Sequence, residues 1–255
     1  MSKTIISLPE SADIKFPVRV NRFLYLAGVS SRRQADRFIE QGLVYINDKP
    51  VELGQKVNQG DQVSIAQKVD NYRRSFVYYI FNKPTDVVSH NPQVLASGRE
   101  KTVEDIFKPK DGPVFPVGRL DKASHGLMFL TNDTRLIDRM LNPKFEHEKE
   151  YVVKVDKDIS NHFIKHMNAG VDIEGYQTKP TQTRQMDDRR FRIILTEGKK
   201  HQIRRMCAAL GYQVQDLKRV RIMNLKLKNL GLGKARKVTD KELEGLFDNF
   251  KHLDA

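Results

Sequence analysis

Apolar residues recur at helical spacing in two short stretches near the start of the chain. The first covers residues 21–27, and the second runs to about Gln41. Ser30 or Ser31 can cap the second helix at its start, and Gly42 is suited to end it. The apolar side chains that would face a shared core are Phe23, Leu24, Ala27, Ala35, Phe38 and Ile39.

Helical and strand patterns are mixed along the rest of the chain. Helical spacing marks residues 134–141 and 200–210, and a capping box of Thr239 and Glu242 opens a last helix through Phe247. β-prone or alternating runs predict strands at 43–46, 62–65, 76–81, 127–130, 149–156 and 191–195. This irregular succession predicts an α+β fold, and the glycine-rich nucleotide-binding fingerprints are absent from the sequence.

Polarity divides the chain into four parts. Residues 1–17 combine serine, proline and mixed charge, and they predict a loose leader. Residues 18–66 hold the first two helices and two strands, and they predict a small compact unit. Residues 67–75 are polar and predict a linker, which leaves 76–255 as a larger second unit.

Positive charge is concentrated late in the sequence. The formal net charge is +13. From Glu197 to Lys237 there are twelve Lys and Arg against two acids, a net of +10, whereas residues 1–70 hold ten against eight, a net of +2. Such a balance indicates a polyanionic partner, either nucleic acid or an acidic membrane surface, that meets mainly the late segment.

The sequence also limits the compartment. Cys207 is the single cysteine, so no intramolecular disulfide can form and a reducing compartment is favoured. The N-terminal residues lack the apolar core of a signal peptide, and no apolar run approaches the roughly 18–20 residues that span a bilayer. We therefore expect a cytoplasmic, monomeric protein without a membrane partner.

Five arginines crowd the two predicted helices of the small unit. Two of them follow the capping serine, where the helix dipole disfavours cations, so an external anion such as phosphate would stabilise them. A solvated basic face is the alternative interpretation. The five residues are Arg19, Arg22, Arg32, Arg33 and Arg37.

The same stretch, from Val18 to about Ile65, resembles an S4-type RNA-binding domain. The resemblance rests on the succession Arg-Val-Asn-Arg-Phe-Leu, Gly-Val-Ser-Ser-Arg-Arg-Gln-Ala-Asp-Arg-Phe-Ile, Gly-Leu-Val-Tyr-Ile-Asn-Asp-Lys-Pro-Val and Gly-Asp-Gln-Val. It implies a small module of the αL type that binds structured RNA through the five arginines.

A polar loop with two glycines separates two apolar stretches at residues 116–127 (Pro-Val-Gly-Arg-Leu-Asp-Lys-Ala-Ser-His-Gly-Leu). Asp121 lies two residues after Arg119. From these residues alone, a salt bridge that closes the loop is the simpler interpretation.

The complete loop resembles the signature loop of the RNA pseudouridine synthases, in the S4-bearing (RsuA) branch that modifies ribosomal RNA. Three more stretches are similar to family motifs and occur in the order that the family has: 81–84 (Phe-Asn-Lys-Pro) before the loop, and 148–151 (Glu-Lys-Glu-Tyr) and 195–206 after it. The resemblance runs from about residue 18 to 247 and implies a larger catalytic domain with a mixed or antiparallel sheet. Asp86 departs from the family, which usually has glycine there.

This resemblance implies roles for five residues. Asp121 is the family's essential carboxylate and acts as nucleophile or base while uracil leaves C1′ of the ribose and rejoins through C5. Tyr151 stacks on the target base, unless it is only a packed strand residue. Arg204 pairs with the carboxylate and favours its ionised form, unless it is a surface arginine. Arg119 would lie beside the extruded nucleotide, and Lys83 would help to orient the loop.

The late basic segment adds Lys199, Lys200 and Arg205 to the expected RNA-binding set. The implied substrate is ribosomal RNA. The residues at 146–151 and 219–224 look most similar to family members that act on 23S RNA, which favours 23S RNA as the substrate. A tRNA is a second candidate. A non-catalytic S4-bearing assembly protein is the competing interpretation.

No cofactor and no metal are expected, because the reaction is an isomerisation without net redox change or group transfer. His162 and His166 are four residues apart, as metal ligands on a helix can be, but no third ligand accompanies them. Cys207 falls on an apolar helical stripe, which indicates a core residue.

Overall fold

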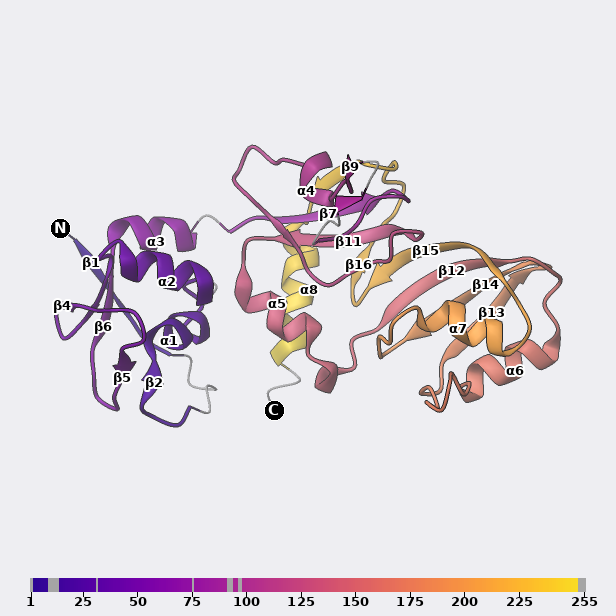
Figure 1. Ribbon diagram of the computed structural model, residues 1–255, viewed down its shortest axis with the longest axis horizontal. Coiled ribbons are helices and arrows are strands. Elements are labelled where there is room, and N and C mark those ends of the chain that lie inside the picture. The colour runs from indigo at the N-terminus through magenta and orange to yellow at the C-terminus, as the bar shows by residue number, and fades with distance from the viewer. Residues whose placement is uncertain are drawn as a thin grey trace. The chain divides into compact units, whose positions relative to one another are not determined.

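The computed structural model describes residues 2–8, 14–30, 32–74, 76–90, 94–95 and 98–251. The chain divides into two compact units (Figure 1). The first is built from the described residues up to Val77 and from Thr131–Arg139. The second is built from Tyr78–Leu130 and from Met140 onward. No helix among the described residues is long and apolar enough to cross a membrane.

The first unit contains a four-stranded sheet in the order β1-β6-β3-β4. Its strands are β1 (Lys3–Ile6), β3 (Val44–Ile46), β4 (Lys49–Pro50) and β6 (Val63–Ala66), and β2 (Val18–Arg19) pairs separately with β5 (Lys56–Val57). The expectation of a loose leader was wrong for residues 3–6. They pair antiparallel with β6 and bury Ile6, while Ile5 points outward.

Three helices pack on this unit: α1 (Val20–Leu26), α2 (Arg32–Glu40) and α3 (Gln67–Arg74). The first two confirm the helical spacing. The third corrects the expected linker at 67–75, because Val69 is fully buried in the core of the unit and Tyr72 packs edge-on against Phe38 with ring centroids 5.4 Å apart. One apolar and one aromatic side chain of this mostly polar helix therefore belong to the packed part of the unit.

The helix and strand ends follow the turn chemistry of the sequence. Gly42 has φ +66° and ends α2, with its N–H donating to the carbonyl of Ile39. Asn47 and Asp48 have φ of +48° and +65° in the turn between β3 and β4. Of the two serines expected to cap α2, Ser31 lies outside the described residues.

The second unit is built on a mixed sheet in the order β13-β14-β12-β15-β11-β7-β17. The strands are β7 (Tyr78–Lys83), β11 (His125–Thr131), β12 (Lys149–Val155), β13 (Gln182–Asp187), β14 (Arg190–Leu195), β15 (Val214–Ile222) and β17 (Ala235–Lys237), with β10 (Phe115–Pro116) and β16 (Leu225–Lys226) at its side. β12 runs antiparallel to both β14 and β15, whereas β11 and β15 are parallel.

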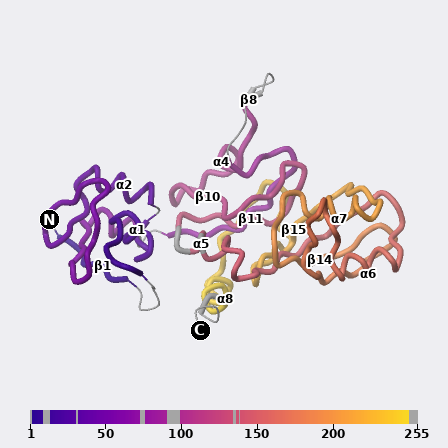
Figure 2. Tube along the Cα trace, turned by 60° about the horizontal axis from the view of Figure 1, so that its bottom comes forward, coloured from indigo at the N-terminus to yellow at the C-terminus, as the bar shows by residue number. Residues whose placement is uncertain are grey.

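Two helices cover part of one face of this sheet, α6 (Asn161–Ala169) and α7 (Gln202–Ala209). Figures 1 and 2 show them beside β12–β15 from two directions. The apolar cluster between them and the sheet includes Phe163, Phe191, Ile203 and Met206. The remaining elements are α4 (Val103–Ile106), α5 (Thr134–Leu141), a 3₁₀ turn at Pro143–Phe145, α8 (Asp240–Lys251) and the short pair β8 (Val94–Leu95) and β9 (Gly98–Arg99). The predicted α+β fold is confirmed.

The capping box before α8 is confirmed and extended by an ion pair. Glu242 accepts a hydrogen bond from the backbone N–H of Thr239 at 3.1 Å, and Arg236 donates to both carboxylate oxygens at 2.7 and 2.8 Å. Arg236 and the hydrogen bond from Thr239 lower the pKa of Glu242 to about 2, although burial opposes them.

We expect Glu242→Gln to lower the free energy of unfolding at pH 7 by roughly 1–3 kcal/mol, because it breaks a partly buried, bidentate ion pair. The folded pKa lies below the unfolded value, so this stabilisation is complete above pH 4.5 and is lost as the pH falls toward 2. Urea unfolding at pH 7 and pH 3 measures both effects.

Glu244→Gln on the exposed side of the same helix is the matched control, because no ion pair is seen for Glu244 among the described residues. Equal losses for the two variants at pH 7 would contradict the assignment.

Candidate active site

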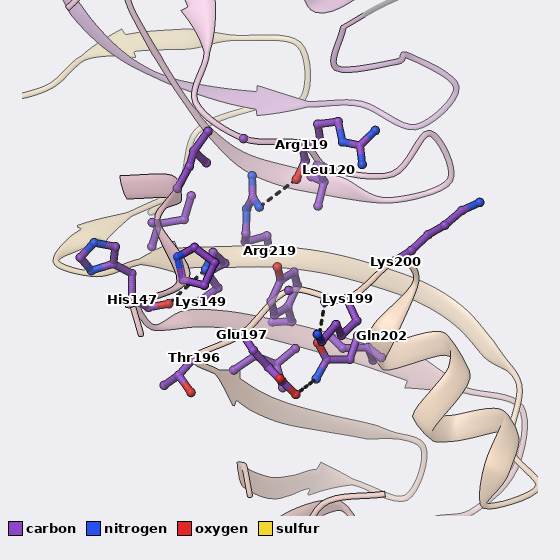
Figure 3. A pocket seen from close by; sticks show the side chains of 18 of the residues that line it. Arg119, Leu120, His147, Lys149, Thr196, Glu197, Lys199, Lys200, Gln202 and Arg219 are labelled. Atoms are coloured by element: carbon purple, nitrogen blue, oxygen red, sulfur yellow. Dashed lines mark hydrogen bonds between the residues drawn. The ribbon is translucent and has the colours of Figure 1, made fainter. Parts of the chain in front are cut away.

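A pocket of about 490 Å³ lies in the second unit, beside the loop that carries Asp121. Its walls come from the β10–β11 loop, the strands β12 and β15, and the segment that leads into α7 (Figure 3). The charged and aromatic residues on these walls that matter below are Arg119, Asp121, Tyr151, Glu197, His201 and Arg219.

Two glycines allow the Asp121 loop to pack closely. Gly118 has φ +79° and Gly126 has φ +110°, conformations that other residues rarely adopt. A Cβ on Gly126 would come within 2.3 Å of the carbonyl oxygen of Arg219 on the parallel neighbour β15. The loop therefore ends at a position where a side chain would push it away from β15.

Ser89 holds the residue before Asp121 by both of its backbone polar groups. The buried hydroxyl of Ser89 donates to the carbonyl of Leu120 at 2.7 Å and accepts from the N–H of Leu120 at 2.9 Å. On the far side of the carboxylate, the N–H of Ser124 donates to the carbonyl of Asp121 at 3.0 Å. The backbone at the carboxylate is therefore fixed on both sides.

The turn after β7 touches the same loop. Asp86 has φ +63°, so the position where the family usually has glycine does require a left-handed backbone, and Asp adopts it. Its N–H donates to the carbonyl of Lys122 at 2.9 Å. Lys83 is fully buried and donates to the carbonyls of Pro84 and Val87 at 2.8 and 2.6 Å, so it orders this turn.

Lys83 also lies in the electrostatic field of the pocket. Burial and the positive charge of Arg219 lower the pKa of Lys83 to about 8, while Asp121 and Asp86 act in the opposite direction. The hydrogen bonds of Lys83 order its own turn, and its link to Asp121 is electrostatic.

The expected ion pair between Arg204 and Asp121 is not formed. Arg204 instead donates to the carbonyls of Ala123 at 3.0 Å and Val214 at 3.2 Å, on either side of its guanidinium group. These two carbonyl oxygens take the N–H groups of Arg204 that we expected to bind the carboxylate of Asp121. Arg204 therefore positions the loop of Asp121 and does not pair with its side chain.

The carboxylate of Asp121 faces the pocket and is 39% exposed. The nearest basic group among the described residues is His201, whose Nε2 lies 3.7 Å from Oδ1, beyond hydrogen-bonding distance. His201 adopts φ +52° just before α7, which turns its side chain toward the loop. Asp121 is therefore held in place by its backbone while its side chain stays available.

Tyr151 and Arg119 also reach the pocket, as expected. Tyr151 lies half-buried on β12, where it lines the pocket and also packs against the apolar cluster under α6 and α7. Both readings of this residue are thus compatible. Arg119 is exposed on the Asp121 loop at the pocket wall.

Glu197 is the second carboxylate on the pocket wall, but its oxygens are occupied. It accepts hydrogen bonds from the Tyr176 hydroxyl at 2.7 Å, from the Lys179 N–H at 3.0 Å and from Gln202 at 2.7 Å. Burial raises the pKa of Glu197, and these donors together outweigh that effect and lower it. Glu197 fixes the segment that leads into α7.

The other basic residues differ in their positions. Lys199 and Lys200 are exposed on the pocket wall, and Lys199 lies 4.1 Å above the ring centre of Tyr176. Arg205 is not brought to the pocket, because it pairs with Glu174 at 2.8 Å and donates to the carbonyl of Ile173. In the first unit all five predicted arginines are exposed, and none forms an ion pair with a described residue.

Four residues of the site were missed by sequence reasoning: Ser89, Glu197, His201 and Arg219. Each acts through a contact with a residue distant in the chain. For three of them the sequence held one signal, their place inside motif-like stretches: Glu197 and His201 lie within residues 195–206, and Arg219 lies within 219–224. Ser89 lies in none of these stretches.

The weaker candidates behave as structural residues. Cys207 is buried in the apolar cluster under α7, and burial raises the pKa of its thiol to about 12. The rings of His162 and His166 lie 3.9 Å apart on α6. Among the described residues, no group of three His, Cys, Asp or Glu side chains could hold a metal ion.

Residues 77–209 match the family of RNA pseudouridylate synthases, and residues 18–63 match the S4 domain. The chain belongs to the RNA pseudouridine synthases, in their S4-bearing RsuA branch. It is therefore an enzyme that isomerises uridine in RNA.

Individual relatives agree with this assignment. The chain is 43% identical over 242 residues to the dual-specificity RNA pseudouridine synthase RluF of Escherichia coli O6:H1, covering 94% of this chain and 80% of the relative. It is 35% identical to the ribosomal large subunit pseudouridine synthase B of Bacillus subtilis, covering 89% and 95%. A crystal structure of a pseudouridylate synthase superposes with a TM-score of 0.65 at 28% identity, covering 90% and 99%.

The burial of Cys207 gives a direct test of its structural role. We expect the native protein to react with a chromogenic disulfide reagent at pH 8 at least about 100-fold more slowly than the urea-unfolded protein, because the reactive thiolate is scarce and shielded. The absorbance of the released thiol measures both rates. Fast labelling of the native protein would contradict the buried position.

Proposed function

We propose that this enzyme converts a specific uridine of ribosomal RNA to pseudouridine, with 23S rRNA favoured, and that Asp121 is its essential carboxylate. The observation that carries the proposal is the contrast between the two carboxylates on the pocket wall. Glu197 is occupied by three donors, whereas the side chain of Asp121 accepts no hydrogen bond from a described residue. Only Asp121 is free to meet a nucleotide.

The pocket supports the chemistry that such a carboxylate performs. Its half-buried Tyr151 offers a ring on which an extruded base can stack, and its exposed Arg119 lies on the same loop as Asp121. Extrusion of the target base costs a few kcal/mol, which contacts to the RNA backbone offset. The C1′–N1 bond then breaks, the uracil turns, and a C5–C1′ bond forms with loss of the C5 proton.

The S4 unit supports a role in holding the RNA. Its five exposed arginines on and beside α1 and α2 lack acidic partners among the described residues, so their charge is available to phosphates. In the second unit, Lys199 and Lys200 extend from the pocket wall and serve the same purpose close to the reacting nucleotide. The set fits recognition of a structured RNA by its shape and backbone.

We propose a tRNA as a second substrate, because relatives such as that of E. coli are named dual-specificity enzymes. We also propose that the enzyme works as a monomer in the cytoplasm. A single, buried and unpaired cysteine fits a reducing compartment.

Replacement of Asp121 by Asn tests the catalytic assignment. We expect the variant to lose roughly 10³-fold or more in the rate of tritium release from rRNA transcripts labelled at uridine C5, because an amide serves neither as nucleophile nor as base. Carbodiimide primer extension maps the modified uridine, and a parallel assay with tRNA transcripts tests the second substrate.

Asp187→Asn is the matched control, since Asp187 is a carboxylate of the β13–β14 hairpin that pairs with Arg190 and does not line the pocket. Activity that survives in Asp121→Asn would sink the assignment. A wild type that binds rRNA without releasing tritium would instead favour the non-catalytic assembly protein.

Charge removal on the S4 unit tests the RNA contact. We expect Arg32→Gln with Arg33→Gln to weaken rRNA binding and to reduce the slope of log affinity against log salt by about 1–2, because two phosphate contacts are lost. Filter binding between 50 and 200 mM salt measures the slope.

Arg189→Gln with Arg190→Gln removes the same charge from the β13–β14 hairpin, where both arginines are paired with aspartates. An equal loss of slope in this control would refute a specific role of the S4 arginines.

A further inference from the structure

Arg219 is a buried cation without a counter-ion on the inner part of β15. It is 3% exposed, and no carboxylate of a described residue lies within 4 Å of it. Its Nε donates to the carbonyl of Leu127 at 2.7 Å and its Nη1 to the carbonyl of Arg119 at 3.4 Å. Its Nη2 is buried and has no hydrogen-bond partner among the residues that the structure describes. An unsatisfied buried donor of this kind is costly for stability and calls for an explanation, which the place of Arg219 in the pocket offers.

The register of the sheet places Arg219 beside the stacking residue. Tyr151 on β12 is the direct antiparallel partner of Arg219 on β15, and both line the pocket. Directly opposed residues project from the same face with Cβ atoms about 4.5–5.5 Å apart. Figure 3 shows the guanidinium group of Arg219 reaching from β15 to the loop segment of Arg119 and Leu120, beside the other residues that line the pocket. A base stacked on Tyr151 would have one edge against this group.

Two further cations lie near the same place, the buried Lys83 and the half-buried Lys149. Lys149, two residues before Tyr151 on β12, also lines the pocket, and burial together with the charge of Arg219 lowers its pKa. Burial and the charge of Arg219 lower the pKa of Lys83 as well. Gathering like charges away from water is unfavourable unless negative charge arrives with the substrate.

Negative charge does develop in this reaction at the edge of the base. When the C1′–N1 bond breaks, its electron pair remains on N1 and spreads onto the O2 and O4 carbonyl oxygens of uracil. The charge is discharged when C5 bonds to C1′, the C5 proton leaves and N1 takes up a proton. Preformed donors that face the place where charge develops are among the strongest contributors to catalysis.

On this basis, and resting on the proposed function, we propose that Arg219 is a catalytic residue that donates from Nη2 to a carbonyl oxygen of the extruded uracil and stabilises the detached base as an anion. Its other two donors hold the Asp121 loop at Leu127 and Arg119. The same side chain thereby fixes the distance between the carboxylate at the ribose and the donor at the base.

Substrates with a single sulfur atom separate this role from a merely structural one. The target uridine of an rRNA fragment is replaced by 2-thiouridine or 4-thiouridine, because a thiocarbonyl is a poor hydrogen-bond acceptor. Single-turnover rates of C5 tritium release are measured for the wild type, Arg219→Gln and Arg219→Lys. Arg221→Gln is the control on the same strand, since Arg221 pairs with Glu148 and Glu150 and does not line the pocket.

We expect Arg219→Gln to react roughly 10- to 100-fold more slowly than the wild type with normal uridine, as for loss of a hydrogen bond from a charged donor. One of the two thio-substitutions should slow the wild type and Arg221→Gln about 10-fold or more. The same substitution should have little effect on Arg219→Gln, and Arg219→Lys should retain part of both the rate and the sulfur effect.

An equal sulfur effect in the wild type and Arg219→Gln would overturn the proposal, because a residue that only holds the loop changes both substrates alike. If Arg219→Gln fails to fold, as judged by thermal melting, the sulfur effects of Arg219→Lys and the wild type are compared instead. Absence of a sulfur effect at both carbonyls of the wild type also overturns it. A wild type inactive on normal uridine in every RNA would refute the proposed function itself, which is a distinct result.

Discussion

The close contact between β11 and β15 is the constraint on which the site depends. These strands run parallel, and Gly126 lies so near the backbone of Arg219 that only a residue without a side chain fits. The contact brings the end of the Asp121 loop onto β15 and lets the side chain of Arg219 reach the carbonyls of Leu127 and Arg119. With Ser89 on the opposite side, the loop has little freedom left. Such fixed geometry suits the catalytic role that we propose for the carboxylate of Asp121.

Both units keep positive charge without acidic partners, at a cost to stability. In the second unit this charge lies near the pocket, on the buried Lys83 and Arg219 and on the half-buried Lys149. In the first unit it is exposed on α1 and α2. Other cations are paired with carboxylates, as in the bidentate pair of Arg236 with Glu242 or the pairing of Arg221 with Glu150. The cations of α1, α2 and the pocket are the ones that we propose to meet RNA, whereas these paired cations contribute to the stability of the fold.

The sequence predicted features that depend on nearby residues and missed features that depend on residues far apart in the chain. Helices with a strong apolar stripe and the capping box at Thr239 were predictable, because they depend on residues a few positions apart. The leader and the linker were misjudged, because each contains little apolar character. Ile6 and Val69 became core residues only through contact with strands and helices formed elsewhere in the chain.

The site divides in the same way. The sequence by itself determined the fold class, and it placed Asp121 in a polar loop and Tyr151 in a strand, since these features rest on local patterns and ordered motifs. Only the tertiary structure decided that Arg204 binds the backbone of that loop in place of its carboxylate, and that Arg219 lies across from Tyr151. The physical reason is that a guanidinium group can donate a hydrogen bond to any well-placed oxygen. Strand register and loop packing, between residues up to about 100 positions apart, decide which oxygen it meets.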